Sequence, residues 1–378
     1  MTRFCPDTDA QVVDAVQTAL AESRRLEILG LGSKRTIGKA VDGDLLDLSG
    51  LTGILSYDPA ELVLTARAGT PLSHIEAALA EANQHFAFEP FHPNALLGTQ
   101  DQTLGGMLAA GLAGPRRIQA GSVRDHVLGF QAVSGRGEAF KAGGKVVKNV
   151  TGFDLSKLMA GSWGTLAVLT EVTFKTLPRP ETEATLAVPG LTDTQATTFL
   201  AAAMGSPAEV SGAAFANGRS LLRLEGIAAS VAYRADLLKA LAPGHVEMLD
   251  QATSRATWTA IRDGSALASQ PGVIWRVSCA PTQGLALVAA ISAEAPAEAV
   301  LDWQGGLIWL LLPEPMSLRL RELLARHGSG HATLIRADDA TRRATPCFQP
   351  QEPALAALTA RVKAAFDPEG ILNPGRMD

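Results

Sequence analysis

The chain has 378 residues, of which 47% are hydrophobic, and its 33 Lys and Arg are outnumbered by 38 Asp and Glu, giving a formal net charge of −5. This length predicts a large core and two domains, and this charge argues against a polyanionic partner such as nucleic acid or an anionic membrane surface. The three cysteines, Cys5, Cys279 and Cys347, lie far apart and outside any C-x-x-C spacing, which argues against a disulfide framework, an iron–sulfur cluster or a structural zinc site.

The N-terminal region alternates helical and strand patterns. Asp7 and Thr8 are capping candidates ahead of a helix whose apolar residues, such as Val12 and Val16, recur at helical spacing. Strands are expected at LEILGLG, DLLDLS, GILSYD and LVLTARAG, and Thr70 with Pro71 is expected to open the next helix. The N-terminus has no apolar signal core and the run LIWLLL is too short to span a bilayer, so we expect a cytoplasmic protein that reaches a membrane only through partners.

A glycine-rich loop, GLGSKRTIG, follows the first of these strands. It is not a dinucleotide-binding fingerprint, because Arg35 stands where a third glycine is needed and no amphipathic helix follows. It is not a Walker A loop either, since Ala40 stands where a hydroxyl must meet magnesium. The loop is consistent with backbone N–H groups converging on an anion, with charge added by Lys34 and Arg35, and equally consistent with an ordinary surface turn.

Residues 90–175 contain a high concentration of glycine. TLGGMLAAGLAG is predicted to be a helix whose small residues allow either a flat ring system or a second helix to pack against its backbone. SGRGEAF reads as a turn between strands, and GTLAVLTEVTFK as a buried strand rich in β-branched residues.

Several of these motifs together resemble a known family. GLGSKRTIG, TLGG, GPRR, GSVRDHVLG, GGKVVKNVTGFDLSKLMAGSWGTLAVLTEVTFK and the terminal FDPEGILNPGRM are similar to the vanillyl-alcohol oxidase type of FAD-binding flavoproteins. Within that type they look most like the FAD-binding subunits of bacterial glycolate oxidases, also called glycolate dehydrogenases. The resemblance covers residues 1–180 and the C-terminal segment, in the family order.

The resemblance implies an FAD that is bound non-covalently, because the loop holds neither His nor Cys. The loop would wrap the FAD pyrophosphate, the TLGG stretch would lie beside flavin and pyrophosphate, and other motifs would hold ribose, adenine and isoalloxazine. In this sequence Ala167 stands where relatives usually have glycine, which would crowd the FAD slightly. The implied FAD contacts are Gly30, Leu31, Gly32, Ser33, Lys34, Arg35, Gly38, Thr103, Leu104, Gly105, Gly106, Gly121, Ser122, Asn149, Gly152, Asp154, Gly164, Thr165, Val168 and Arg376.

The family's architecture implies an α+β fold in three parts. Residues 1–179 would form the FAD-binding domain of two α/β subdomains, residues 180–345 a ferredoxin-like α+β cap domain, and residues 346–378 a segment that returns to the FAD domain. In the cap region, TDTQATTFLAAAM and the stretch around Tyr233 are expected to be helices, and TEATLAV, SGAAFAN and SLLRLEG are expected to be strands. The stretch PALAALTARVKAAF is predicted to be the final helix.

The resemblance implies an FAD-binding subunit of a multi-subunit enzyme that oxidises glycolate to glyoxylate, working beside a catalytic flavoprotein subunit and an iron–sulfur subunit that takes the electrons. A self-sufficient FAD-dependent 2-hydroxy-acid dehydrogenase, or a flavin-free structural subunit of the same complex, is an alternative. Catalytic relatives carry a metal-binding H-x-G-D-G-N-x-H stretch, whereas RHGSGHATLIR offers only His327 and His331 on a glycine turn, so no metal is expected.

The catalytic residues stay unassigned. Arg116 and Arg117 could bind a substrate carboxylate or a partner's acidic surface, or could lie in a solvated loop. His92 and His126 have no identifiable partner in the sequence and are expected to be satisfied or exposed histidines. The tryptophans of the cap region are expected to lie in its core, with subunit contact as the second interpretation.

Overall fold

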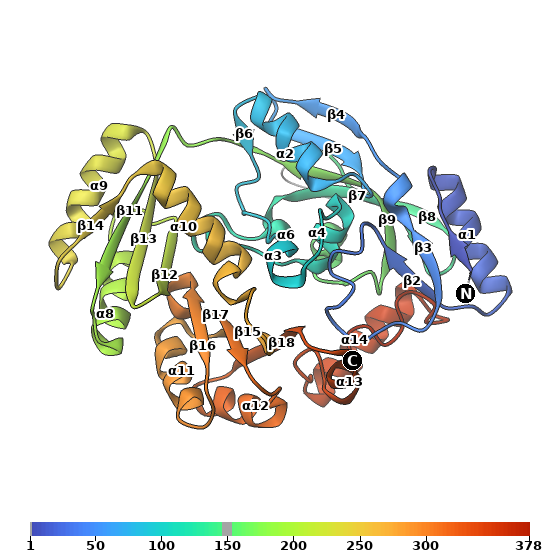
Figure 1. Cartoon of the computed structure of the whole chain (residues 1–378). Coiled ribbons are helices and arrows are strands. Elements are labelled where there is room, and N and C mark those ends of the chain that lie inside the picture. The colour runs from blue at the N-terminus through green and yellow to red at the C-terminus, as the bar shows by residue number, and fades with distance from the viewer. Residues whose placement is uncertain (1, 146–152) are drawn as a thin grey trace. The chain divides into compact units, whose positions relative to one another are not determined.

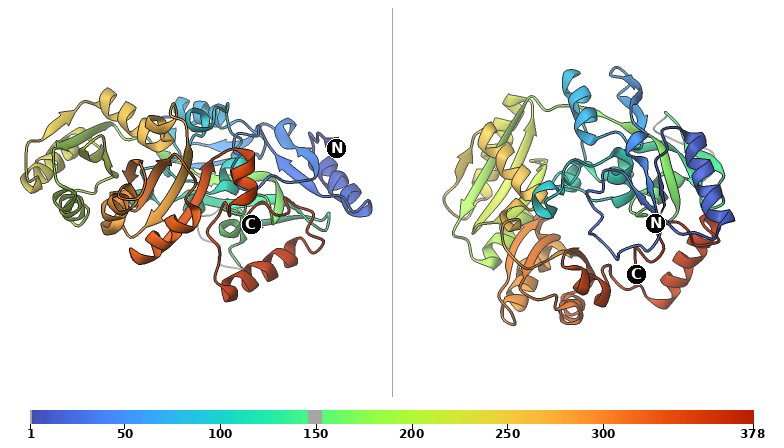
Figure 2. Two further views of the ribbon diagram at one scale, coloured as in Figure 1. Left: turned by 60° about the horizontal axis from the view of Figure 1, so that its bottom comes forward. Right: turned by 45° about the vertical axis from the view of Figure 1, so that its right-hand side comes forward.

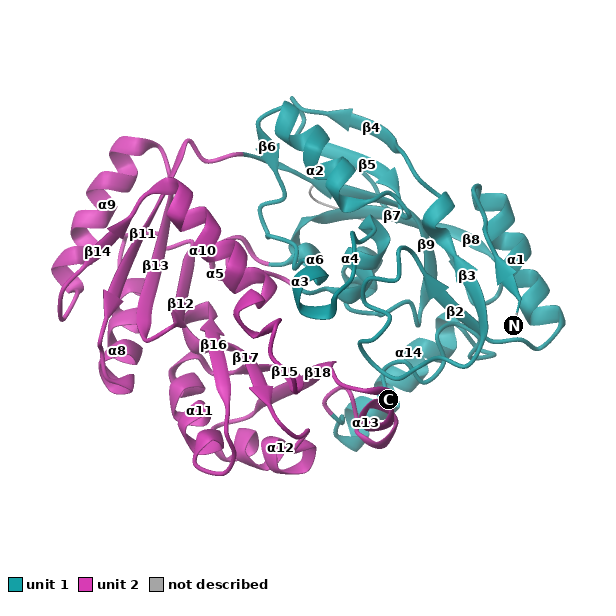
Figure 3. Ribbon diagram, in the orientation of Figure 1, with its two compact units in different colours: residues 1–112, 122–178, 350–378 teal, residues 113–121, 179–349 magenta. Residues whose placement is uncertain are grey.

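The computed structural model describes residues 2–145 and 153–378 and divides into two compact units (Figure 3). Unit 1 comprises residues 1–112, 122–178 and 350–378, and unit 2 comprises residues 113–121 and 179–349. The domain limits expected from the sequence did not separate residues 113–121 from the FAD-binding part, and the contacts that tie this segment to unit 2 are described below. Within the described ranges, no helix is long and apolar enough to cross a membrane.

Unit 1 begins with a small parallel sheet of order β1-β3-β2, formed by Arg3–Phe4, Asp44–Asp47 and Leu26–Leu29 (Figure 1). Helix α1, Asp9–Ala21, is capped by the Thr8 side chain and buries its apolar stripe in the core that includes this sheet's Leu26 and Leu46. The helical spacing of Val12 and Val16 therefore places both on the buried side.

The larger sheet of unit 1 is five-stranded and antiparallel, with order β4-β5-β9-β7-β8. Helices α2 and α4 contribute to the core that includes its apolar side chains. Helix α4 is shorter than the sequence predicted, because the backbone enters the left-handed region at Gly111, with φ of 65°, and the helix stops there. The bounds are Ile54–Asp58 (β4), Val63–Arg67 (β5), Ala167–Lys175 (β9), Val127–Ser134 (β7), Ala139–Gly143 (β8), Leu72–Glu81 (α2) and Leu104–Ala110 (α4).

Short elements and a returning C-terminal segment complete unit 1. The last helix, α14, spans Pro353–Phe366, the stretch that the sequence predicted. Beyond it, the Leu26 N–H donates to the Ile371 carbonyl at 2.8 Å and the Ile28 N–H to the Asn373 side chain at 2.8 Å, so the segment lies along β2 (Figure 2). The short elements are Gln84–His85 (β6), Leu177–Pro178 (β10), Asn94–Leu97 (α3), Val123–His126 (α6) and Leu155–Met159 (α7).

Unit 2 is built on one eight-stranded antiparallel sheet of order β14-β11-β13-β12-β16-β17-β15-β18. The chain order β-α-β-β-α-β occurs twice, in β11 to β14 with α8 and α9, and in β15 to β18 with α11 and α12. Both sets have ferredoxin-like strand order, and we call them module 1 and module 2. Strands β12 and β16 join the modules edge to edge, with Phe215 opposite Leu301.

The bounds in module 1 are Thr182–Pro189 (β11), Asp193–Met204 (α8), Gly212–Ala216 (β12), Arg219–Gly226 (β13), Ala228–Leu241 (α9) and Glu247–Leu249 (β14). Those in module 2 are Val273–Cys279 (β15), Gly284–Ser292 (α11), Glu298–Asp302 (β16), Leu307–Leu312 (β17), Ser317–Arg326 (α12) and Gly330–Arg336 (β18). Helix α10, Gln251–Asp263, joins the modules, α13 spans Asp339–Ala344, and α5 spans Arg117–Ala120 in the separate segment.

The two modules place their helices on one face of the sheet. Leu222 and Leu224 of β13 share a core with α8 and α9, and Val277 and Ile308 share a core with α11 and α12. The strand register carries this face across the junction between the modules, because Phe215, Leu301, Ile308 and Val277 are successive cross-strand partners. We call the opposite face, which carries the alternate residues of each strand, the polar face.

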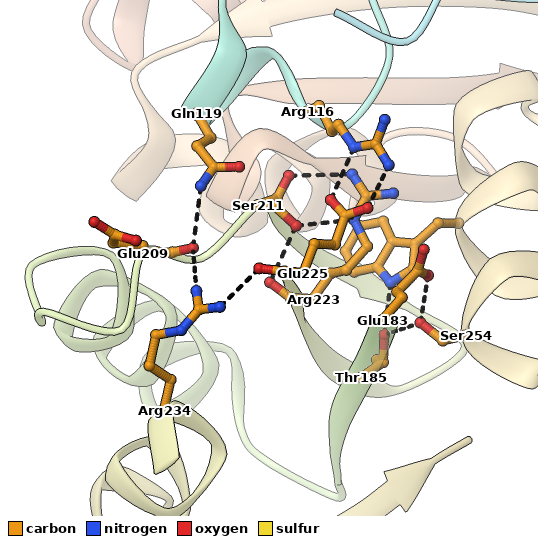
Figure 4. A network of polar contacts seen from close by, with 11 residues as sticks. Arg116, Gln119, Glu183, Thr185, Glu209, Ser211, Arg223, Glu225, Arg234 and Ser254 are labelled. Atoms are coloured by element: carbon orange, nitrogen blue, oxygen red, sulfur yellow. Dashed lines mark hydrogen bonds and ion pairs between the residues drawn. The ribbon is translucent and has the colours of Figure 1, made fainter. Parts of the chain in front are cut away.

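Residues 113–121 belong to unit 2 because their side chains are tied to module 1 (Figure 4). Arg116 donates from Nε to Glu225 Oε2 at 2.8 Å and from Nη2 to Oε1, and both side chains are largely buried. Gln119 donates to the Glu209 carbonyl, and Ile118 packs against the core of module 1. The interpretation that Arg116 lies in a solvated loop is therefore wrong, because its guanidinium forms an ion pair with Glu225 of the same chain.

Candidate functional site: the glycine-rich loop of unit 1

The glycine-rich loop lines a pocket in unit 1. Thr103 and Gly106 contribute from the start of α4, and Arg376 from the C-terminal segment. The loop, helix α4 and the C-terminal segment are distant in sequence and therefore meet at this pocket only in the fold. The lining residues are Leu29, Gly30, Leu31, Gly32, Ser33, Lys34, Arg35, Thr103, Gly106, Ala109, Ala110, Trp163 and Arg376.

Two glycines give the loop its shape. At Gly30 a Cβ atom would lie 2.4 Å from Thr103 Oγ1, so only glycine allows the loop to approach α4 this closely. Gly32 has a φ of 71°, and a Cβ there would meet no atom within 4 Å, so its outer side is open. In the part of the chain that the structure describes, the N–H groups of Gly32, Ser33 and Lys34 find no hydrogen-bond acceptor. A diphosphate is a suitable acceptor for successive N–H groups of this kind.

Lys34 is a buried cation inside the loop. Its side chain is 7% exposed, and its Nζ donates to Gln102 Oε1 at 2.6 Å and lies 3.4 Å from Ser33 Oγ. Burial lowers the pKa of Lys34 to about 7, and the opposing attraction of Asp101 is smaller. An anion bound in the pocket would favour the charged form of this amine.

Arg35 and Arg376 have different parts in the loop. Arg35 donates from Nε to Glu27 Oε1 at 2.8 Å, so its guanidinium is held by a carboxylate of β2. Arg376 is 5% exposed and donates from Nη2 to the Lys34 carbonyl at 2.7 Å. The C-terminal segment thereby fixes the backbone of the loop.

The other sequence-predicted contacts lie in several places. Leu104 and Val168 are fully buried in hydrophobic cores, and a Cβ at Gly105 would lie 2.8 Å from the Ala68 Cβ, so these three form close packing within unit 1. Gly38 ends the loop with a φ of 79°. Ser122 begins a part of unit 1, whereas Gly121 is the last residue of the segment in unit 2.

The remaining contacts predicted from the sequence lie beyond the pocket lining. Thr165 donates from its hydroxyl to the Ser162 carbonyl, and a Cβ at Gly164 would lie 2.7 Å from Asn373 Nδ2. Asp154 pairs with Lys157 on α7. Asn149 and Gly152 lie outside the described residues.

Ala109 and Ala110 are among the small residues of the TLGGMLAAGLAG helix that the sequence offered to a flat ring system, and both line the pocket, whereas sequence reasoning missed Trp163. Ala109 and Ala110 lie three and four residues after Gly106 on α4, so helical spacing brings them to the same pocket. Trp163 is placed by a left-handed backbone, with φ of 53°, which local spacing does not reveal.

The histidines are placed without a metal-binding cluster. Among the described residues, no group of three or more His, Cys, Asp and Glu could hold a metal ion. His327 follows the end of α12 and His331 lies in β18, with the glycine turn between them. His92 lies with Nε2 3.3 Å from Glu76 Oε1, and His126 packs its ring 5.4 Å from that of Phe88, so the structure supplies neighbours that the sequence did not identify.

Comparison with known proteins gives the class first. Residues 3–143 match the family model for an FAD binding domain, and residues 348–377 match that for the C-terminal domain of FAD linked oxidases. The fold is that of p-cresol methylhydroxylase, with a TM-score of 0.75 over 99% of this chain and 88% of that one, at 13% identity. The loop, its open N–H groups and these matches define an FAD-binding flavoprotein of the α+β type.

The family follows from a relative that matches over its full length. Glycolate oxidase subunit GlcE of Escherichia coli (strain K12) is 38% identical over 381 residues, covering 100% of this chain and 99% of that protein. Glycolate oxidase subunit GlcD of Bacillus subtilis (strain 168) is 35% identical over 134 residues, covering 35% of this chain and 27% of that protein. The chain belongs to the family of glycolate oxidase subunit GlcE, within the FAD-linked oxidoreductases.

Proposed function

We propose that this chain is the FAD-binding subunit of a glycolate-oxidising complex and that an iron–sulfur subunit of the complex receives the electrons. The observation that carries the proposal is the match over the whole length of a glycolate oxidase subunit, together with a loop suited to a diphosphate. The cysteines Cys5, Cys279 and Cys347 are separate thiols, which fits a cluster carried by another subunit.

In this proposal the residues of unit 1 hold the cofactor and the bound FAD supplies two-electron acceptor chemistry. Gly32, Ser33 and Lys34 would present N–H groups to the diphosphate, with the Lys34 amine adding charge. Arg376 would keep the loop closed through the Lys34 carbonyl. These roles concern binding and orientation.

The test is copurification. The tagged chain, expressed with its neighbouring subunits, should copurify with a second flavoprotein and an iron–sulfur protein, and flavin and iron should be counted in the product. Glycolate-dependent reduction of an artificial acceptor by that complex, with flavin present in this chain, is the expected result. A complex that oxidises glycolate while this chain holds no flavin would leave it as a structural subunit.

FAD should be bound non-covalently, because the residues that line the pocket include neither His nor Cys. Acid precipitation of the holoprotein should release all the yellow colour into the supernatant. Flavin that stays with the pellet would contradict this expectation and would place a covalent link elsewhere in the chain.

A further inference from the structure

Module 2 carries a group of basic side chains on the polar face of its sheet. Trp275 and Val277 of β15 point into the core shared with α11 and α12, so Arg276 between them lies on the opposite face. The register places Trp309 and Thr333 directly beside Arg276 on that face, and His331 in the next row beside Ser278.

The guanidinium of Arg276 is buried and incompletely bonded. Arg276 is 7% exposed, and its Nε and Nη2 atoms have no hydrogen-bond acceptor among the described residues. Burial, followed by the repulsion of Arg117, lowers the pKa of Arg276 to about 10 despite the attraction of Asp302. A buried donor without an acceptor is costly, and a charged one more so, which makes such a group in a folded protein a candidate for ligand contact.

A second arginine, Arg117, lies against the Trp303 ring together with Arg276. The guanidinium of Arg117 lies 4.6 Å from the centroid of the Trp303 ring, and that of Arg276 lies 5.0 Å from it. Trp303 has a left-handed backbone, with φ of 52°, and its indole N–H donates to the Gly114 carbonyl at 3.0 Å. The ring is therefore fixed in place, at a cost in backbone strain, with two arginines against it.

Two arginines and a histidine lie in this part of the polar face. His331 lies in the row next to Arg276, because the register pairs Thr333 with Arg276 and His331 with Ser278. Burial first, and then the charges of Arg276 and Arg117, lower the pKa of His331. The acidic group that acts on Arg276 is Asp302, one oxygen of which already accepts the Trp303 N–H at 2.7 Å.

Module 1 shows what the same face looks like when its arginines are paired. There Arg116 directs its Nε and Nη2 fork at the Glu225 carboxylate, and Arg223 lies 3.4 Å from the same carboxylate (Figure 4). On helix α12 of module 2, Arg319 also directs Nε and Nη2 at one carboxylate, that of Glu294, at 2.7 and 2.6 Å. In Arg276 the equivalent fork meets no carboxylate of the described chain.

We propose that the Nε and Nη2 fork of Arg276, with Arg117 and His331 beside it, binds the carboxylate of a small organic acid. The planar fork matches the two oxygens of a carboxylate, and the Trp303 ring gives the acid an apolar wall. The site would allow this subunit to bind the acid itself. The choice of glycolate as the acid rests on the proposed function, whereas the carboxylate site does not.

The experiment is a titration of the full chain with sodium glycolate at constant ionic strength, followed by tryptophan fluorescence and by calorimetry. The wild type should show saturable binding, and ethylene glycol, which lacks the carboxylate, should show none. Arg276→Gln should weaken glycolate binding at least about tenfold, since a charge-assisted bidentate contact is worth more than 1.4 kcal/mol. The matched control is Arg321→Gln, which removes an arginine that lies 5.2 Å from the Trp275 ring on the other face of the same module, and should bind like the wild type.

Several outcomes would overturn the inference. These are no saturable binding by the wild type, equal affinity in Arg276→Gln, or competition by chloride and sulfate as strong as by glycolate, which would mean an adventitious ion only. If thermal melting shows that Arg276→Gln does not fold, Arg117→Gln and His331→Gln are titrated in its place. Wild-type affinity for glycolate in both of these variants would also overturn the inference. Copurification and FAD content of the wild type test the proposed function separately, so a failure here leaves that result intact.

Discussion

Gly32 and Lys34 shape the loop in different ways. Gly32 leaves space on its outer side, because a Cβ there would meet no atom within 4 Å, while Lys34 puts a buried amine beneath the same loop. The first residue acts by having no side chain and the second by holding a charge whose cost of burial an anion can offset. Substituting each one tests a different part of the proposed diphosphate site.

Gly32→Asp should abolish FAD binding. The aspartate side chain would occupy the open side of the loop and bring a negative charge to the N–H groups meant for a diphosphate. The matched control is Gly190→Asp in unit 2, which has nearly the same φ, 72° against 71°, and equally open surroundings, so it carries the same backbone strain of about 1–2 kcal/mol away from the pocket. Flavin content after gel filtration measures the result, and stoichiometric FAD in a folded Gly32→Asp protein would show that the pyrophosphate site is misplaced.

FAD affinity should fall as pH rises above about 7. The pKa of Lys34 in the chain without ligand is about 7, so above that pH the amine is mostly neutral and must take up a proton to pair with the diphosphate. Linkage then weakens binding by up to about tenfold per pH unit, until the pH reaches the raised pKa of the bound state. FAD titrations between pH 6 and 9 should show this slope in the wild type and in Arg35→Gln, and a flat profile in Lys34→Gln; a flat wild-type profile would contradict the prediction.

Among the elements, the segment 113–121 has an unusual position. The residues before and after it in the sequence belong to unit 1, whereas the segment itself belongs to unit 2. Its two consecutive arginines reach both modules: Arg116 pairs with Glu225 of module 1, and Arg117 lies against Trp303 of module 2. The segment therefore connects the paired half of the polar face with the half that holds the proposed carboxylate site. The ion pair between Arg116 and Glu225 holds the segment to module 1.

Glu225→Gln should destabilise the fold at pH 7 by about 3 kcal/mol, since it leaves Arg116 and Arg223 without their buried carboxylate. Burial acts to raise the pKa of Glu225, but the charge of Arg223 and the hydrogen bond from Arg116 outweigh it and bring the pKa down from 4.5 to about 2. The carboxylate thus stabilises the fold fully above pH 4.5 and loses this effect as the pH falls toward about 2.

Urea unfolding of the wild type and Glu225→Gln at pH 7, 4 and 3 measures this difference, which should shrink with pH. Glu247→Gln is the matched control, because its pair with Arg219 is a third or more exposed on both sides and should be worth about 1 kcal/mol or less. If the two substitutions lower the free energy of unfolding equally, the buried pair contributes no more stability than the exposed one.

At the scale of the whole molecule, the cofactor site and the proposed acid site lie in different units. Unit 1 carries the loop, α4 and the C-terminal segment, and unit 2 carries two ferredoxin-like modules joined through β12 and β16. The described residues contain no cluster of three or more His, Cys, Asp and Glu side chains that could hold a metal ion.

The isolated chain should show negligible glycolate turnover with an artificial electron acceptor. General acid–base assistance is worth roughly a hundred- to ten-thousand-fold in rate, so a chain without a placed base or metal should be a very poor enzyme. The assembled complex, assayed with the same acceptor, is the positive control. Brisk metal-dependent turnover by the isolated chain would instead support a self-sufficient dehydrogenase.

Local patterns were sufficient for much of the fold. The helical spacing in PALAALTARVKAAF predicted α14, and the β-branched run GTLAVLTEVTFK predicted β9, because both depend on neighbours along the chain. The motif order was sufficient for the resemblance to the FAD-binding family, which the full-length relative confirms. The end of α4 was missed, since a glycine inside a small-residue run can either continue a helix or stop it.

The sequence by itself determined where the glycine loop and many of the strands and helices lie, and which cofactor family they belong to. Only the tertiary structure decided which charged groups meet: Arg116 pairs with Glu225 across 109 residues, whereas the Nε and Nη2 atoms of Arg276 meet no carboxylate among the described residues. It also decided that the two modules form one sheet and that residues 113–121 belong to unit 2. The physical reason is that secondary structure follows local periodicity, while pairing and burial depend on contacts between residues far apart in the chain.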